Sequence, residues 1–444
     1  MSASRSVSIA RFGDAAVRAE IQIVDGRRVV WIDIAGGRRH GAIGLRGAET
    51  AIRGVRLATR HQIPIVIVLD SGGADVSEGI SALHGWGLLA KAIVDASGAV
   101  PILFGVAGAC VSGPSLLLGI ADIAVMATNA FAYVSGPGDT AAVTGEIVNR
   151  TELGGAVVHS RDSGVTCAIV DSPEDLHTFI ELVLSYLPSN SLSEPPVVLV
   201  ADPRARANEP ILQIIPTNMN TPYDVRNIIA DIADADSVLE LRETYAPNLV
   251  TALVRLQGRT VGVVANQPQW RAGTLDIEAS RKAARFVTWC DAFNIAILTL
   301  VDTPGFEPGR DLEWRGMIRH GAQLVHAYCD ATVPRVSVIM RKAFGGAYIV
   351  MDSRGIGNDI CFAWPGAQIA VMGTDGATQI LGSKGLTADE YELRFLNPWQ
   401  AADRGFVDDV INPATTRSAV IEAFETLALK TRNSRRRRHS NSPL

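Results

Sequence analysis

The stretch VPRVSVIMRKAFGGAYIVM, residues 333–351, decides the fold. Its apolar, β-branched residues from Val336 to Met340 predict a buried strand, which two basic residues, Arg341 and Lys342, follow. The next residues, Ala-Phe-Gly-Gly-Ala-Tyr, are mostly small, so the backbone can approach another group closely. A strand that turns at glycines into a helix leaves peptide N–H groups without helical partners, and such groups can bind an anion. A turn needed only for packing is the second interpretation.

A diverged copy of this arrangement occurs earlier in the chain. The strand-like segment VPILF, residues 100–104, leads to a small-residue turn, ACVSGPS at 109–115, and then to an apolar run. A second strand and a glycine follow each copy, at 130–137 and at 364–373. A duplication with so long a period indicates two similar domains, each with its own turn. Two such turns that face each other would form a single site.

Each copy is preceded by an apolar strand that ends in an acidic residue and a turn. Residues 63–69 lead into DSGGA at 70–74, and residues 295–301 lead into DTPGF at 302–306. Such runs are typical of strands buried on both faces of a parallel sheet, and ligands bind at the carboxyl ends of these strands. Asp70 can instead act only in a turn or as a helix cap. The repeated strand–helix–strand order predicts α/β domains with mainly parallel sheets.

Composition limits the class of protein. The chain has 444 residues, of which 47% are hydrophobic, enough for two domains with sizeable cores. A net charge of -5 argues against binding of nucleic acid by the folded body. The five cysteines show no CxxC pair and no metal-like spacing with histidine, which favours free thiols, a cytoplasmic location and no metal site. The N-terminus lacks the apolar core of a signal peptide, and prolines and glycines interrupt residues 99–121, so no membrane span is expected.

These patterns divide the chain into four segments. We expect a first domain at 1–190, a linker rich in Pro, Ser and Asn at 191–215, a second domain at 216–431 and a basic tail at 432–444. The tail contains an Arg-Arg-Arg-Arg run and is expected to be solvated, with partner docking or nucleic-acid binding as the alternative.

Taken together, the motifs resemble those of the carboxyltransferase β subunits of biotin-dependent acyl-CoA carboxylases, the propionyl-CoA and acetyl-CoA carboxylase type. The resemblance extends from about residue 48 to near the C-terminus. It is carried by DSGGA at 70–74, LHG at 83–85, TELGGA at 151–156, PYDVR at 222–226, NQP at 266–268, GTLD at 273–276, DTPGF at 302–306, RHGA at 319–322, RKAFGGAY at 341–348 and NP at 397–398.

The resemblance implies two tandem crotonase-like domains related by internal duplication. It implies carboxyl transfer from carboxybiotin to the α-carbon of an acyl-CoA, with the thioester held by the first domain and biotin by the second, across a dimer interface in a ring, usually a hexamer. The implied partner is an α subunit with biotin carboxylase and biotinyl carrier functions. No side-chain base is needed if backbone N–H groups stabilise the charge on the ureido oxygen and on the thioester enolate.

The resemblance also assigns the candidate site residues. The backbone donors are Gly346 and Ala347 on the biotin side and Ser112 and Gly113 on the acyl-CoA side. Substrate binding is assigned to Gly72, Gly73, Ala74, Gly136, Tyr348 and Ile349. Biotin binding is assigned to Gly305, Phe306, Phe344 and Gly345.

The chain departs from the family pattern in three respects. Ser112 and Gly113 stand where the family usually has a Gly-Gly pair, and Pro114, which follows them, has no N–H. Asp75 stands where it usually has Arg, and Ile349 where propionyl-type members typically have Asp. The acyl group is therefore expected to differ from propionyl. Two alternatives stay open: an acyl-CoA decarboxylase of malonyl or methylmalonyl type, or a related enolate enzyme, and a non-catalytic assembly subunit.

Overall fold

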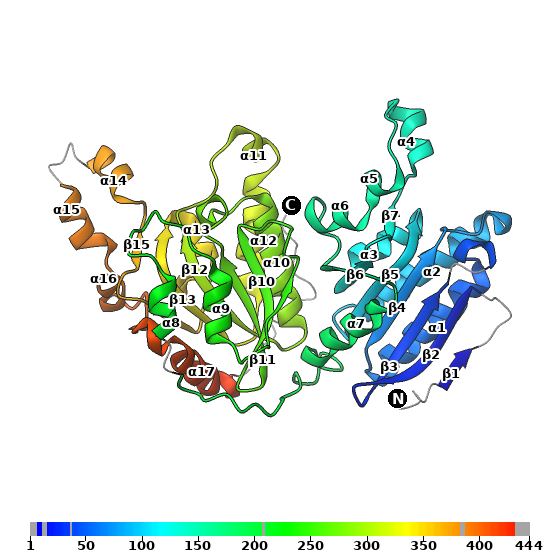
Figure 1. Cartoon of the computed structure of the whole chain (residues 1–444), viewed down its shortest axis with the longest axis horizontal. Coiled ribbons are helices and arrows are strands. Elements are labelled where there is room, and N and C mark those ends of the chain that lie inside the picture. The colour runs from blue at the N-terminus through cyan, green and yellow to red at the C-terminus, as the bar shows by residue number, and fades with distance from the viewer. Residues whose placement is uncertain (1–6, 11–15, 36–37, 207–208, 382–386, 431–444) are drawn as a thin grey trace. The chain divides into compact units, whose positions relative to one another are not determined.

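The computed structural model describes residues 7–10, 16–35, 38–206, 209–381 and 387–430, so the expected basic tail lies outside the described residues. The chain forms two compact units (Figure 1), which are Met1–Pro196 with Arg242–Tyr245, and Val197–Leu241 with Ala246–Leu444. Each unit is built on one eight-stranded sheet. The prediction of two tandem α/β domains is confirmed. Among the described helices, none is long and apolar enough to cross a membrane.

The sheet of the first unit begins with two antiparallel pairings and continues as parallel strands. Its strands are β1 (Val7–Ala10), β2 (Val17–Val24), β3 (Arg27–Ile34), β4 (Ile65–Ser71), β5 (Ile102–Val111), β6 (Ile123–Ala127), β7 (Phe131–Tyr133) and β8 (Ala168–Val170). The helices are α1 (Leu45–His61), α2 (Ile80–Ala96), α3 (Leu117–Ile120), α4 (Pro137–Thr144), α5 (Arg150–Gly154), α6 (Ala156–Arg161) and α7 (Asp175–Tyr186), with the 3-10 turns η1 (Arg38–Gly41), η2 (Val76–Glu78) and η3 (Gly113–Leu116). Helix α1 packs on β2 and β3 and against α2, whereas α7 packs on β5 and β6.

The second unit contains the corresponding strands. They are β9 (Leu239–Leu241), β10 (Leu249–Leu256), β11 (Arg259–Asn266), β12 (Ala296–Thr303), β13 (Arg335–Phe344), β14 (Ile360–Ala363), β15 (Gln368–Ala370) and β16 (Asp409–Val410). The helices are α8 (Glu209–Ile214), α9 (Val225–Ile232), α10 (Ile277–Ala292), α11 (Arg310–Trp314), α12 (Met317–Asp330), α13 (Gly345–Val350), α14 (Thr374–Leu381), α15 (Ala388–Tyr391), η7 (Glu392–Leu396), α16 (Pro398–Asp403) and α17 (Thr416–Thr426). The core of this unit joins α9 and α17 to the central strands.

The two sheets have the same topology. The first runs β1-β2-β3-β4-β5-β6-β8, with β7 paired to β5, and the second repeats this order from β9 to β16, with β15 paired to β13. Strands β12 and β13 are buried along nearly their whole length, as the apolar runs predicted. Because both the order and the side pairing recur, each strand of one sheet has a structural counterpart in the other.

The two central strands of each sheet share one irregularity. Between the pairs Leu69–Val106 and Ser71–Cys110, β5 advances four residues while β4 advances two. The same bulge occurs between β12 and β13. In each unit an aspartate spans it: the Asp70 carboxylate accepts a hydrogen bond from the Ala109 N–H at 3.0 Å, and Asp302 accepts one from the Lys342 N–H at 3.1 Å. A bulge redirects the strand, so these bonds set where the following turn begins.

The surroundings of the two aspartates differ in charge. Asp302 is buried and also accepts hydrogen bonds from the Arg341 Nε at 2.8 Å and from the Tyr223 hydroxyl at 2.9 Å. Gly108 takes the place of Arg341 in the first unit, where an added Cβ would lie 2.4 Å from the Asp70 carboxylate. The buried ion pair is therefore specific to the second unit.

Replacing Asp302 with Ala should cost far more stability than replacing Asp70. Asp302→Ala leaves the buried Arg341 guanidinium unpaired, and we expect a loss of about 3–5 kcal/mol in the free energy of unfolding. Asp70→Ala leaves one backbone donor without its acceptor, at a cost of about 1–3 kcal/mol. Urea denaturation of the two variants measures both losses, and equal values would contradict the assignment of the ion pair to one unit.

Candidate functional site

In the first unit, two turns meet at the carboxyl ends of β4 and β5. A Cβ added to Gly73 would lie 3.2 Å from the Ser112 Cβ and 3.2 Å from the Val111 carbonyl oxygen, and the φ of 100° at Gly73 disfavours any side chain there. Ile43 bridges to Ala74: its N–H donates to the Gly73 carbonyl at 2.8 Å, and its carbonyl accepts from the next N–H, of residue 75, at 3.0 Å. Among the described residues, the Ala74 N–H takes no partner, so it can serve a ligand.

The second of these turns, residues 112–114, offers one peptide N–H to a ligand. The N–H of Ser112 is already used, because it donates to the Tyr133 carbonyl at 2.9 Å and extends the pairing of β5 with β7. Gly113 is the first residue of η3, where an N–H has no helical partner. Pro114 has no N–H. The expected pair of donors at Ser112 and Gly113 is thus reduced to Gly113.

The Trp86 side chain fixes the position of Gly113. A Cβ added to Gly113 would lie 2.7 Å from the indole ring, closer than any side chain tolerates. Sequence reasoning did not identify Trp86, although its position four residues after the buried Ala82 places both on one face of α2. The turn at residues 112–114 therefore packs against the ring of Trp86, which belongs to α2.

The polar side chains around this turn are engaged in holding the backbone. Burial raises the pKa of Cys110 to about 12, so its thiol stays protonated at neutral pH and does not act as a nucleophile. The His159 Nε2 lies 2.7 Å from the Ala132 carbonyl and its Nδ1 lies 2.8 Å from the Ser163 hydroxyl. Asp75 is buried and accepts hydrogen bonds from the N–H and the hydroxyl of residue 77. The chemistry available here is that of backbone donors.

The remaining candidate of the first unit, Gly136, lies at the start of α4, after β7. Its N–H donates to the Asp139 carboxylate at 3.3 Å, and its α-carbon faces the Tyr133 ring, which an added Cβ would approach to 3.5 Å. Gly136 can therefore bring backbone close to a ligand, but its N–H is already occupied.

The second unit repeats the pair of turns. The Leu275 N–H donates to the Gly305 carbonyl at 3.1 Å, and the N–H of residue 307 donates to the Leu275 carbonyl at 2.9 Å, as Ile43 does in the first unit. A Cβ added to Gly346 would lie 3.5 Å from the Phe306 ring. Gly346 and Ala347 lie in the first turn of α13, where N–H groups have no helical partners, and no side chain caps that helix.

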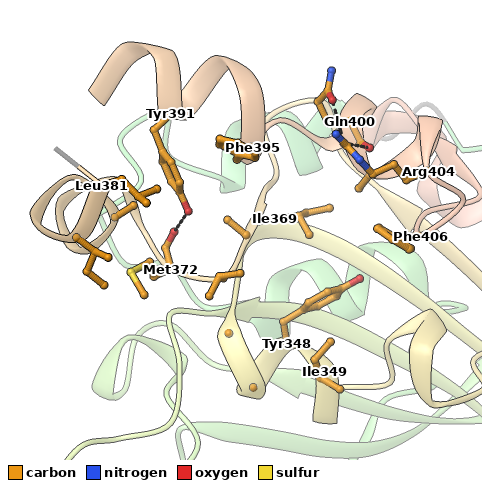
Figure 2. Close-up of a pocket in the computed structure, with 17 residues that line it drawn as sticks. Tyr348, Ile349, Ile369, Met372, Leu381, Tyr391, Phe395, Gln400, Arg404 and Phe406 are labelled. Carbon is orange, nitrogen blue, oxygen red and sulfur yellow. Dashed lines mark hydrogen bonds between the residues drawn. The ribbon is translucent and has the colours of Figure 1, made fainter. Parts of the chain in front are cut away.

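A cavity of about 780 Å³ opens beside Gly345 and Gly346 (Figure 2). Figure 2 shows Tyr348 and Ile349 of α13 on one side and Tyr391 and Phe395 on the other. The remaining walls come from β15, α14 and α16 and are mostly apolar: Ile369, Ala370, Val371, Met372, Ala377, Ile380, Leu381, Gln400, Ala401, Arg404 and Phe406.

The polar groups of the cavity wall are mostly satisfied within the unit. The Tyr391 hydroxyl donates to the Met372 carbonyl at 3.0 Å, and Arg404 Nη1 donates to the Gln400 carbonyl at 2.8 Å. The Phe344 ring is buried and packs with Ala377, Tyr391 and Leu396, behind the cavity wall. Phe344 can therefore contribute backbone, and not its ring, to a ligand.

The arrangement suits a ligand that is largely apolar and carries an oxygen atom on which negative charge develops. An apolar, partly closed cavity lowers the local dielectric constant, and the backbone donors at its wall are fixed by the strand ends. Donors held in place in this way stabilise an oxyanion without reorganising during the reaction.

Comparison with known proteins agrees with this chemistry. Residues 4–442 match the carboxyl transferase domain family. The chain is 41% identical, over 91% of its length and 80% of the relative, to methylmalonyl-CoA decarboxylase subunit alpha of Veillonella parvula. It is 43% identical, over 87% of its length and 78% of the relative, to the propionyl-CoA carboxylase beta chain of Roseobacter denitrificans. The hexameric transcarboxylase 12S, solved with methylmalonyl-CoA and methylmalonic acid bound, superposes with a TM-score of 0.96 at 37% identity, over 99% of this chain and 90% of that one.

Two glycine substitutions test the contact that positions the first turn. Gly113→Ala places a methyl group against the Trp86 ring, so we expect a loss of about 1–3 kcal/mol in the free energy of unfolding. The control is Gly87→Ala on the same helix as Trp86, where an added Cβ meets nothing within 4 Å. Because alanine is favoured over glycine inside a helix, this control should gain about 0.5–1 kcal/mol. Urea denaturation measures both, and a stable Gly113→Ala variant would refute the contact.

Proposed function

The chain belongs to the carboxyl transferase family and has its tandem crotonase-like domains, and from this premise we propose that it is the carboxyltransferase subunit of a biotin-dependent acyl-CoA carboxylase. It moves a carboxyl group between carboxybiotin and the α-carbon of an acyl-CoA. The observation that carries this proposal is the duplicated pair of turns, at 72–74 with 112–114 and at 304–306 with 345–347, each presenting peptide N–H groups at strand ends.

The first domain is proposed to hold the acyl-CoA thioester. When the α-carbon loses its proton, negative charge develops on the thioester oxygen. The N–H groups of Ala74 and Gly113 are the backbone donors for that oxygen, and Gly72 and Gly73 allow a close approach because they have no side chains. Each well-placed donor of this kind contributes about 3–4 kcal/mol to stabilisation of the transition state.

The second domain is proposed to hold the biotin head group. Carboxybiotin, carried by the proposed α subunit, would supply the carboxyl group and, once it had lost that group, the base for the α-proton. The residues present fit a neutral bicyclic ring with a ureido oxygen, because the cavity is apolar and Gly345 and Gly346, which line it, begin α13, whose first N–H groups have no helical partners. Burial raises the pKa of Tyr348, so its phenol stays neutral beside the ring.

We propose that the subunit works as a cytoplasmic homo-oligomer that binds a biotin carboxylase and biotinyl carrier subunit. In support, the structurally similar transcarboxylase 12S is a hexamer. Large apolar side chains are also exposed around the cavity of the second unit, with Val371, Ile380 and Leu393 at 77%, 60% and 75%. Contiguous apolar patches of this kind are typical of surfaces that another protein covers.

A second candidate function is acyl-CoA decarboxylation. It is favoured by the 41% identity to a methylmalonyl-CoA decarboxylase subunit and by the departures at Ser112 and Pro114. The third candidate, a non-catalytic assembly subunit, is disfavoured because both pairs of turns keep their geometry.

The first test is to incubate the protein with malonyl-CoA or methylmalonyl-CoA, with and without free biotin, and to follow loss of the carboxyl group by mass spectrometry. The proposal predicts loss only when biotin is present, because carboxyl transfer then runs in reverse. Loss without biotin would favour the decarboxylase. If neither thioester loses its carboxyl group in the presence of biotin, a panel of longer acyl-CoAs with a carboxylated carrier follows, and no transfer to any of them would favour the non-catalytic subunit.

A glycine pair provides the matched control for this assay. Gly346→Val places side-chain atoms between the turn and the Phe306 ring and so keeps the ligand oxygen away from the Gly346 N–H. Loss of this oxyanion donor should lower the rate of biotin-dependent carboxyl loss about 100-fold or more. Gly366→Ala, where an added Cβ meets nothing within 4 Å, should leave the rate unchanged.

We propose that the acyl chain, held by the first domain of one protomer, reaches the cavity of the second domain of its partner across the dimer interface. The acyl preference should therefore depend on Ile349, which is 42% exposed and lines that cavity. Ile349→Ala makes room in the cavity beside the turn. We therefore expect the ratio of kcat/KM for hexanoyl-CoA to kcat/KM for propionyl-CoA to rise about tenfold or more. The reason is that one methylene group in an apolar pocket changes the discrimination between substrates by about 10–200-fold. Ile318→Ala, on an exposed face of α12, is the control. An unchanged ratio would show that the acyl group lies elsewhere.

A further inference from the structure

The duplication gives a residue-by-residue correspondence between the two turns. Cys110 pairs with Ser71 and Ala132, and Ala343 pairs in the same way with Thr303 and Ile369. Counting on from these two residues matches Ser112 with Gly345, Gly113 with Gly346, and Pro114 with Ala347. The backbone agrees, because Ser112 has a φ of 63° and Gly345 has a φ of 58°.

This correspondence shows that the first domain has one peptide donor fewer than the second. The second domain offers the N–H groups of Phe306, Gly346 and Ala347. The first offers those of Ala74 and Gly113, because proline replaces the counterpart of Ala347. The missing donor, the N–H that Pro114 lacks, is in the domain that is proposed to bind the thioester enolate.

Ser112 carries a side chain in a conformation that favours glycine. Its φ of 63° and ψ of -149° lie in a region that is essentially restricted to glycine, so the serine is strained there. Glycine would remove the strain and leave the hydrogen bond from the backbone N–H to Tyr133 intact. A side chain that is kept in such a conformation at the mouth of a site indicates that the side chain itself has a role there.

The Ser112 hydroxyl is uncommitted and well placed. It does not cap η3, and among the described residues it has no hydrogen-bond partner. The Ser112 Cβ is 3.2 Å from the position that a Cβ on Gly73 would take, so the side chain lies where the turn that carries the Ala74 N–H meets the turn that carries the Gly113 N–H.

We propose that the Ser112 hydroxyl replaces the missing peptide donor and hydrogen-bonds the thioester oxygen as that oxygen gains negative charge. The inference rests on the proposed function. The hydroxyl does not act as a nucleophile, since no described base contacts it and both nitrogens of the nearby His159 are engaged. The neighbouring Ser115 cannot substitute for it, because the Ser115 hydroxyl donates to the Ser112 carbonyl at 2.7 Å.

The test compares Ser112→Gly and Ser112→Ala with the wild type. The probe is a 2-nitroacyl-CoA, which keeps the thioester and loses its acidic α-proton in solution; the resulting nitronate spreads negative charge onto the thioester oxygen and so mimics the enolate. Loss of one oxyanion donor should weaken binding of this nitronate by about 100-fold in both variants, with little change in affinity for the parent acyl-CoA. In the carboxyl-transfer assay, kcat should fall by a similar factor and KM should stay the same.

The glycine variant separates this role from a structural one. Ser112→Gly should raise the thermal unfolding midpoint, because the strain is removed, while it still loses the nitronate affinity. Ser115→Ala is the control for removal of a hydroxyl from the same turn, and it should keep that affinity. If Ser112→Gly binds the nitronate as tightly as the wild type, the inference is wrong and the proposed function stands. If the wild type itself does not prefer the nitronate over the acyl-CoA, the proposed thioester site is wrong as well.

Discussion

The structure depends on one hydrogen bond, which occurs twice. In each unit, the aspartate at the end of one central strand accepts a bond from a backbone N–H of the next strand, and it does so at a bulge. This bond holds the bulge just before the last paired residues of β5 and β13, and it therefore helps to set the direction of the N–H groups that follow. Because the donors are backbone groups, their positions depend on strand geometry and not on side-chain rotamers.

The two units share the aspartate that spans the bulge, but the groups around that aspartate differ. In the second, the aspartate is buried beside a guanidinium, and burial of the Tyr223 hydroxyl in the same cluster raises the pKa of that phenol. In the first, Gly108 leaves no room for a cation, and the aspartate is only partly buried. Duplication has thus preserved the backbone path while the electrostatics of the two turns diverged, which suits two domains that bind different oxyanions.

Glycines and two aromatic rings, Trp86 and Phe306, account for much of the shape of the two turns. Trp86 leaves no space for a side chain at Gly113, whereas a Cβ added to Gly346 would make an ordinary contact with Phe306, at 3.5 Å. The thiol nearest the first turn, Cys110, stays protonated because burial raises its pKa. Side chains near the turns therefore act mainly as supports, and Ser112 stands out because its hydroxyl supports nothing.

The sequence alone was sufficient to predict the duplication, the apolar strands, the acidic strand ends and the two glycine-containing turns, because these depend on local patterns of residue type. It also identified the family. Three features were decided only by the tertiary structure: the use of the Ser112 N–H by Tyr133, the contact of Trp86 with Gly113, and the cavity walls supplied by residues 369–406. Each depends on which distant segment lies beside the turn, and a local pattern contains no information about that neighbour.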